Sequence, residues 1–137
     1  MSQEELQKKY LELKLLEQQA SQIQQQLIFL ENQKSILEKT KECIDDVKNI
    51  KKDSKALIPL GQGVFAKGSI QDTANLLVGV GHNVVVSKPA QEAKMIIDKQ
   101  LSEIASMTSQ LSSQLQQTAV HAGLLEEELQ ALSSNQE

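Results

Sequence analysis

The sequence predicts an α+β fold in which a long antiparallel α-helical coiled-coil hairpin carries two central β-hairpins. Apolar residues recur at heptad spacing before residue 50 and again after residue 89, whereas Val and Gly are frequent in the segment between them. Aromatic residues are scarce, since the chain has one Tyr, two Phe and no Trp. We therefore expect a single domain over residues 1–137 whose apolar side chains line repetitive surfaces rather than one large core.

The first helix is expected from about residue 3 to about residue 50, because apolar residues repeat there in two heptad rows without Gly or Pro. Lys9, Lys34 and Lys41 interrupt the seam. Polar residues in a coiled-coil seam commonly fix its register at some cost in stability. The two rows contain Leu6, Leu13, Ala20 and Leu27 at one position and Leu16, Ile23, Leu30, Leu37 and Ile44 at the other.

The second helix is expected over about residues 89–133. Pro89 suits the first turn of a helix, because its missing N–H is no loss there. Gly123 lies inside this helix and costs about 1 kcal/mol relative to Ala. The apolar row alternates steps of four and three through Ile97, Leu101, Ile104, Thr108, Leu111, Leu115, Thr118, Ala122, Leu125, Leu129 and Leu132.

The two helices have similar lengths of roughly 65–70 Å at 1.5 Å per residue, which favours an antiparallel pair with the central segment as its connection. Two registers fit the apolar rows. One register places Leu27 near Leu111 and Leu37 near Leu101. A slip of one heptad, which places Leu30 near Leu115, fits almost as well.

Four short strands are expected in the central segment, over residues 56–60, 64–70, 74–80 and 83–88, as two β-hairpins in tandem. Turn residues separate them at 61–63, 71–73 and 81–82. Gly61 and Gly63 supply a permissive backbone at the first hairpin turn, and Gly81, His82 and Asn83 tolerate positive φ at the second.

The central segment, residues 56–88, is too small to form a stable sheet with both faces covered. Pro59 cannot donate to a strand ladder, so the first strand should be an edge or carry a bulge there. Exposed Val-rich strands aggregate unless partner strands pair with the backbone N–H and C=O groups of their edges. The sequence therefore predicts that this segment is a site of oligomerisation, which we call the hub. The hub residues are Leu57, Ile58, Leu60, Val64, Phe65, Ile70, Leu76, Leu77, Val78, Val80, Val84, Val85 and Val86.

Charge and composition exclude several partners. The formal net charge is -4 and the basic residues are scattered, which argues against nucleic acid. No stretch approaches the roughly 20 apolar residues that cross a bilayer, and the N-terminal residues lack an apolar signal core. We expect a soluble, cytoplasmic protein without nucleic-acid or membrane partners.

Neither a catalytic centre nor a cofactor or metal site is expected. Lys67 precedes Gly68 inside a predicted strand, whereas a phosphate-binding loop needs Gly-Lys-Ser/Thr at the start of a helix. His82 and His121 lie on different elements without further ligands at metal spacing. Cys43 has no His on its helix to act as a base. An enzyme is therefore the least favoured class.

The whole chain resembles the alpha-class subunit of prefoldin, in its archaeal form. The resemblance is carried by "IPLGQG" at 58–63, by "LLVGVGHNVVV" at 76–86 and by the return into helix at "PAQEA", between two long heptad helices. The second strand, "VFAKGS", lacks the aromatic residue and proline that eukaryotic relatives usually place there, which favours the archaeal form.

This resemblance implies a fold, partners and an activity. Two alpha-class subunits would join through their hairpins into a double β-barrel platform, to which four beta-class subunits add to make a hexamer. The complex would act as a holdase chaperone. It would capture non-native polypeptides near the coiled-coil tips without nucleotide and deliver these clients to a group II chaperonin.

We call the free end of the helical hairpin, where both chain termini are expected, the tip. It is rich in apolar residues. Leu11, Leu15 and Leu124 fall outside the heptad rows, and a frayed tip would present them to exposed apolar segments of a client. The alternative that they only widen the helix–helix contact stays open, as does a passive coiled-coil scaffold or tether in place of the chaperone. The predicted client-binding residues are Leu6, Tyr10, Leu11, Leu13, Leu15, Leu16, Leu124, Leu125, Leu129 and Leu132.

Overall fold

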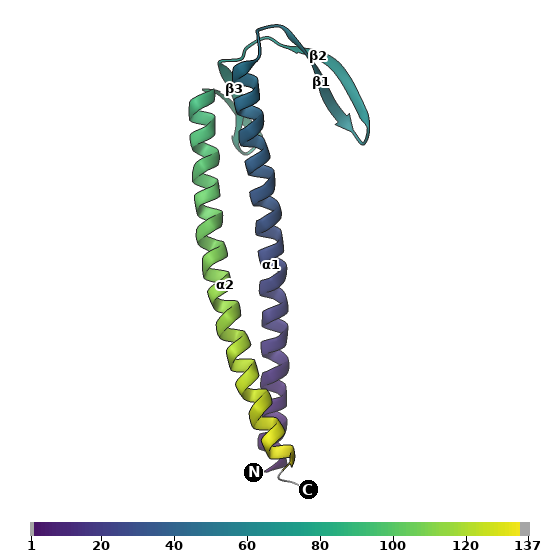
Figure 1. Ribbon diagram of the computed structural model, residues 1–137, viewed down its shortest axis with the longest axis vertical. Helices are drawn as coiled ribbons and strands as arrows, with labels where there is room; N and C mark the ends of the chain where they lie inside the picture. Colours follow the sequence, from purple (N-terminus) through teal and green to yellow (C-terminus); the bar gives the residue numbers. More distant parts are fainter. Residues whose placement is uncertain (1, 135–137) are drawn as a thin grey trace. The chain divides into compact units, whose positions relative to one another are not determined.

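A computed structural model of the chain describes residues 2–134 and contains two long helices, with two β-hairpins between them in the sequence (Figure 1). The elements follow the order α1 (Gln3–Asn49), β1 (Ser54–Gly61), β2 (Val64–Ile70), β3 (Asn75–Gly81), β4 (Val84–Pro89) and α2 (Ala90–Ser134). This order confirms the predicted fold class. The predicted domain over 1–137 also includes residues 1 and 135–137, which lie outside the described residues.

The chain divides into two compact units, and the single domain stays a prediction. The first unit contains the residues up to Lys34 together with those from Glu103 onward. The second unit is Ser35–Ser102, which holds both β-hairpins and the adjoining parts of the two helices.

The two helices begin with defined hydrogen bonds. The Ser2 hydroxyl accepts a bond from the backbone N–H of Glu5 (3.3 Å), which caps α1. Pro89 pairs with Asn75 as the last residue of β4, so α2 begins one residue later than predicted. The first N–H of α2, at Ala90, donates to the Ala74 carbonyl (3.0 Å) in the loop between the hairpins.

In the first unit the helices pair antiparallel along the predicted heptad rows. The Lys9 Nζ lies 2.6 Å from a Glu128 carboxylate oxygen, which joins the start of α1 to the end of α2. Leu30 and Ile104 are buried, and most other seam residues are half-buried. A seam between only two helices leaves one side of each side chain open to water, so partial burial is the expected result.

The second unit contains a small apolar core where the helices meet the strands. Ile44 of α1 packs with Ala90, Ala93 and Ile97 of α2. Partly buried residues pack against this core from both helices and from β3, namely Leu37, Leu101, Leu76 and Val78. The ion pairs of Lys41 with Asp98 and of Lys94 with Asp45 place this unit in the first of the two predicted registers and not in the heptad slip.

Each hairpin is an antiparallel sheet of two strands, so every described strand is an edge strand. β1 pairs with β2 from Ser54↔Ile70 to Pro59↔Phe65, and the register shifts between Pro59 and Gly61. The predicted irregularity at the proline is therefore confirmed.

The hairpin turns use residues with positive φ. The second turn contains Gly81, His82 and Asn83 with φ of 105°, 51° and 59°, as predicted. At the first turn Gly63 has positive φ, at 74°, whereas Gly61 does not and instead ends β1 where the strand register shifts.

Candidate functional surfaces

The β1–β2 hairpin presents apolar residues on an exposed face. Partners in an antiparallel ladder share a face. One face therefore carries the pairs Leu57↔Lys67 and Pro59↔Phe65. Leu57 is 66% exposed and Phe65 is 56% exposed. Ile58, Leu60 and Val64 are also exposed, whereas Ile70 is half-buried.

The opposite face of this hairpin combines small residues with isoleucines. It carries the pairs Ala56↔Gly68 and Ile58↔Ala66. A Cβ added at Gly68 would lie 2.6 Å from the Ile58 Cδ1, so the Ile58 side chain lies directly over the glycine. This contact depends on the pairing of β1 with β2, so the residues around Gly68 in the sequence do not reveal it.

The β3–β4 hairpin has one partly covered face and one exposed face. Leu76 and Val78 pack against the helical core of the second unit, so these two predicted hub residues are partly buried by their own chain. Leu77, on the other face, is 77% exposed. The remaining predicted hub residues of this hairpin are exposed as well: Val80, Val84, Val85 and Val86. An exposed apolar surface joined to unpaired strand edges is typical of an assembly site.

Asp72 organises the loop between the two hairpins. Its Oδ1 accepts hydrogen bonds from the backbone N–H groups of Ala74 (2.9 Å) and Asn75 (3.0 Å). Hydrogen bonds from Asn75 and then Ala74 hold the pKa of this carboxyl below its ordinary value. Because the Ala74 carbonyl accepts from the first N–H of α2, the loop links both hairpins to that helix. The sequence predicted only a turn at residues 71–73, although Asp is a common acceptor for the N–H two residues on.

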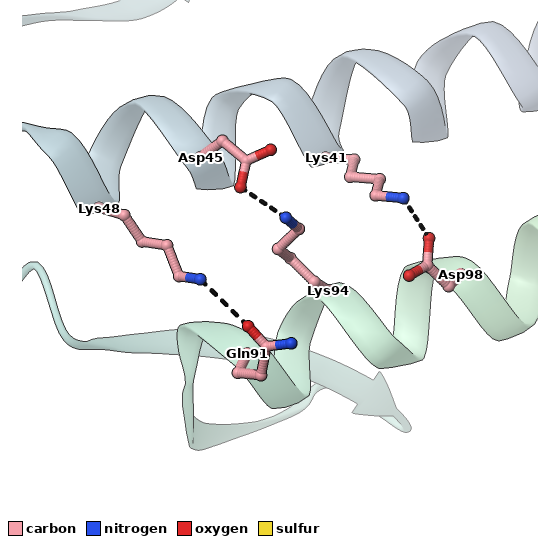
Figure 2. A network of polar contacts seen from close by, with 6 residues as sticks. All are labelled: Lys41, Asp45, Lys48, Gln91, Lys94 and Asp98. Atoms are coloured by element: carbon pink, nitrogen blue, oxygen red, sulfur yellow. Dashed lines mark hydrogen bonds and ion pairs between the residues drawn. The ribbon is translucent and has the colours of Figure 1, made fainter.

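A ladder of polar contacts joins α1 to α2 in the second unit (Figure 2). Lys41 Nζ lies 2.6 Å from Asp98 Oδ1, and Lys94 Nζ lies 2.6 Å from Asp45 Oδ1. A third contact follows at the end of α1, where Lys48 Nζ donates to the Gln91 side-chain oxygen (3.2 Å).

A slip of α1 by one heptad would separate Asp45 from Lys94 and would place Lys48, instead of Lys41, opposite Asp98. The hydrogen bond to Asp98 raises the pKa of Lys41, and the hydrogen bond from Lys94 lowers the pKa of Asp45. Partly exposed ion pairs contribute little to stability. The contacts of the ladder are those of one register of the two helices.

The predicted client-binding residues, all in the first unit, fall into three groups. Leu125 and Leu129 are buried in the seam at 5% and 4% exposure. Leu11, Leu15 and Leu124, which the heptad rows exclude, are 62%, 58% and 56% exposed. Tyr10 is exposed too, and the half-buried residues are Leu6, Leu13, Leu16 and Leu132.

The residues with reactive side chains lie apart. Cys43 is an exposed free thiol. His121 Nε2 lies 3.4 Å from a Glu12 carboxylate oxygen, and His82 lies in a turn. Within residues 2–134 no three His, Cys, Asp or Glu side chains gather as metal ligands would, and no described helix is long and apolar enough to cross a membrane.

Comparison with known proteins identifies the family. The family described as "Prefoldin subunit" matches residues 16–135, which is most of the chain. The chain belongs to the prefoldin family. Its relatives include prefoldin subunit alpha of Archaeoglobus fulgidus, which is 31% identical over 130 residues that cover 95% of each chain. Prefoldin subunit alpha of Methanococcus aeolicus is 29% identical over 93% of this chain and 86% of that one.

A solved structure has the same fold. The chain resembles a subunit in the cryo-EM structure of filamentous PFD from Methanocaldococcus jannaschii, with a TM-score of 0.76 and 15% identity. The match covers 85% of this chain and 96% of the other. With these archaeal relatives, the predicted alpha class is confirmed, and with it a non-enzymatic chaperone role and membership of a prefoldin complex.

Proposed function

We propose that this chain is one of two alpha subunits in a prefoldin hexamer with four beta subunits, which holds non-native polypeptides without nucleotide. The exposed apolar faces of the two hairpins carry the assembly part of this proposal. Leu57, Phe65 and Leu77 expose more than half of their surface on two-stranded sheets whose edges are unpaired. Burying such residues stabilises an assembly by about 1.5–3 kcal/mol for each fully covered side chain.

The apolar tip residues support client binding. Tyr10, Leu11 and Leu15 are exposed outside the seam on α1, and Leu124 is exposed outside it on α2. Unfolded clients expose apolar segments, and contact between those segments and these side chains would remove apolar surface of both from water. Hand-over of the client to a group II chaperonin belongs to the same proposal, and membership of the prefoldin family supports it.

The test uses the hexamer assembled from this chain and a beta-class prefoldin subunit. A chemically denatured model protein is diluted into buffer without nucleotide, and light scattering follows its aggregation. The assembled complex should suppress scattering at about one hexamer per client, and added group II chaperonin with ATP should then recover folded client. Scattering that matches a buffer control would overturn the holdase proposal.

A further inference from the structure

The middle of the first unit has an unusual lack of charge. Residues 18–30 of α1 contain no Asp, Glu, Lys or Arg, and neither do residues 104–125 of α2. Coiled coils usually carry charged residues at the positions that flank the seam. Here glutamines hold many of these positions, and charge returns only at Glu17, Glu31, Glu103 and Glu126.

The glutamines of both helices line one shared groove of about 350 Å³. Gln19, Gln22 and Gln26 come from α1, and Gln114 and Gln117 come from α2. All five side chains are exposed, and Ile23 and Thr118 form the half-buried floor between them. We call this set the glutamine groove.

The glutamine groove continues toward the tip. Gln117 also lines a neighbouring hollow, whose other residues include Val120 and Leu124. Both of these are exposed apolar side chains, and Leu124 is one of the proposed client-binding residues. His121 lines this hollow as well. Because the two hollows share Gln117, a polypeptide held at Leu124 lies next to the groove.

We propose that the glutamine groove is a second client-contact site, which binds an extended, uncharged segment of the non-native polypeptide held at the tip. The inference rests on the proposed function. Each primary amide offers two N–H donors and a carbonyl acceptor, so it matches either group of a free peptide unit. An extended client segment has peptide groups without hydrogen-bond partners. In the middle of a helix the backbone N–H and C=O groups are already bonded to each other, so the glutamine side chains are the groups that can bind the client.

The absence of charge fits the same occupant. Covering a carboxylate or ammonium group with an apolar client segment strips its water at a high cost, whereas an amide that regains a hydrogen bond is covered at little cost. An uncharged groove therefore accepts apolar and polar uncharged segments alike. It would disfavour folded proteins, whose surfaces carry many charges and whose peptide groups are already paired.

The test compares two matched double variants in the assembled hexamer. Gln19→Glu with Gln26→Glu places two charges in the groove. Gln18→Glu with Gln25→Glu places the same charges at the same spacing on exposed positions of the same helix that do not line it. The probe is a fluorescent peptide of about twenty residues made of Ser, Gln, Val and Leu, and fluorescence anisotropy gives its Kd.

The groove variant should bind the peptide at least about fivefold more weakly, since one lost hydrogen bond of about 1 kcal/mol corresponds to that factor. The control variant should stay within about twofold of the parent. Helicity and the native mass of each complex are measured to show that both variants assemble. A photo-crosslinking residue at Gln22 should also capture the peptide, whereas one at Gln25 should not.

Two failures are distinguishable. If the parent hexamer binds the peptide, and both Glu variants bind it equally well with equal crosslinking at the two positions, the groove inference is overturned and the proposed holdase function stands. If the parent hexamer binds neither the peptide nor denatured protein, the proposed function itself fails, and the groove inference fails with it.

Discussion

Replacing the exposed tip leucines should remove client binding and leave the assembly intact. The perturbation is the triple variant Leu11→Ser, Leu15→Ser and Leu124→Ser. These residues lie outside the heptad rows, and more than half of each side chain is in contact with solvent. Substitutions at such exposed positions change stability by about 0.5 kcal/mol or less each. The helices and the native mass of the complex should therefore be unchanged.

The expected loss of affinity follows from the exposed area. Complete burial of a leucine contributes about 1.5–3 kcal/mol, and these side chains expose a little more than half of their surface. If a client covers half of that exposed part, each leucine contributes about 0.5–1 kcal/mol, which is about two- to fivefold in affinity. The triple variant should then bind about 10- to 100-fold more weakly.

The assay is a titration of a fluorescent, chemically denatured model protein with the assembled hexamer. A matched control replaces Ile36 and Met95 with Ser, since both are exposed apolar residues of the second unit. The control should bind as the parent does. Equal affinity for the parent, the control and the triple variant would refute the assignment of these leucines to client binding.

Three further outcomes are expected. Leu129→Ala should lower the free energy of unfolding by about 2–4 kcal/mol, because the residue is buried in the seam. Leu124→Ala should change it by about 0.5 kcal/mol or less, because that residue is exposed. Equal shifts of the two variants in a denaturant titration would contradict the seam assignment. Asp72 has a lowered pKa, so its stabilisation is complete above the ordinary pKa of 3.8 and is lost as the pH falls through the lower value of the folded state. In hydrogen exchange, the backbone amides of Ala74 and Asn75 should therefore lose protection in acid. Asp72→Ala should remove this dependence on pH, and a pH profile that is unchanged in the variant would argue against the two hydrogen bonds. Lys41→Asp and Asp98→Lys should each lower the denaturation midpoint, and the double variant should recover most of it; additive losses would exclude a register role for the pair.

Periodic features of this protein were predictable because each depends on neighbours in the sequence. Heptad spacing places Leu16, Ile23 and Leu30 on one helix face whatever the partner is, and the structure buries or half-buries all three. The two hairpins could also be predicted from the sequence, because their turns contain residues that tolerate positive φ. The same local logic placed Leu11 and Leu15 off the seam, where the structure leaves them exposed.

Features that depend on distant residues were not predictable in the same way. The contacts of Lys41 with Asp98 and of Lys94 with Asp45 exist only in one register, and the apolar rows alone allowed two. The contact of Ile58 with Gly68 requires knowledge of the strand pairing. The tip residues were predicted as one client-binding group, although the heptad row already contained Leu129 and excluded Leu124, and the structure buries the first and exposes the second.

The most direct test of the central claim is the native mass of the complex that forms when this chain is mixed with a beta-class prefoldin subunit. The account predicts one species that contains two copies of this 15.2 kDa chain and four beta subunits, because the exposed hairpin faces leave each copy unable to satisfy its own strands. A chain that stays at 15.2 kDa in the mixture would contradict it.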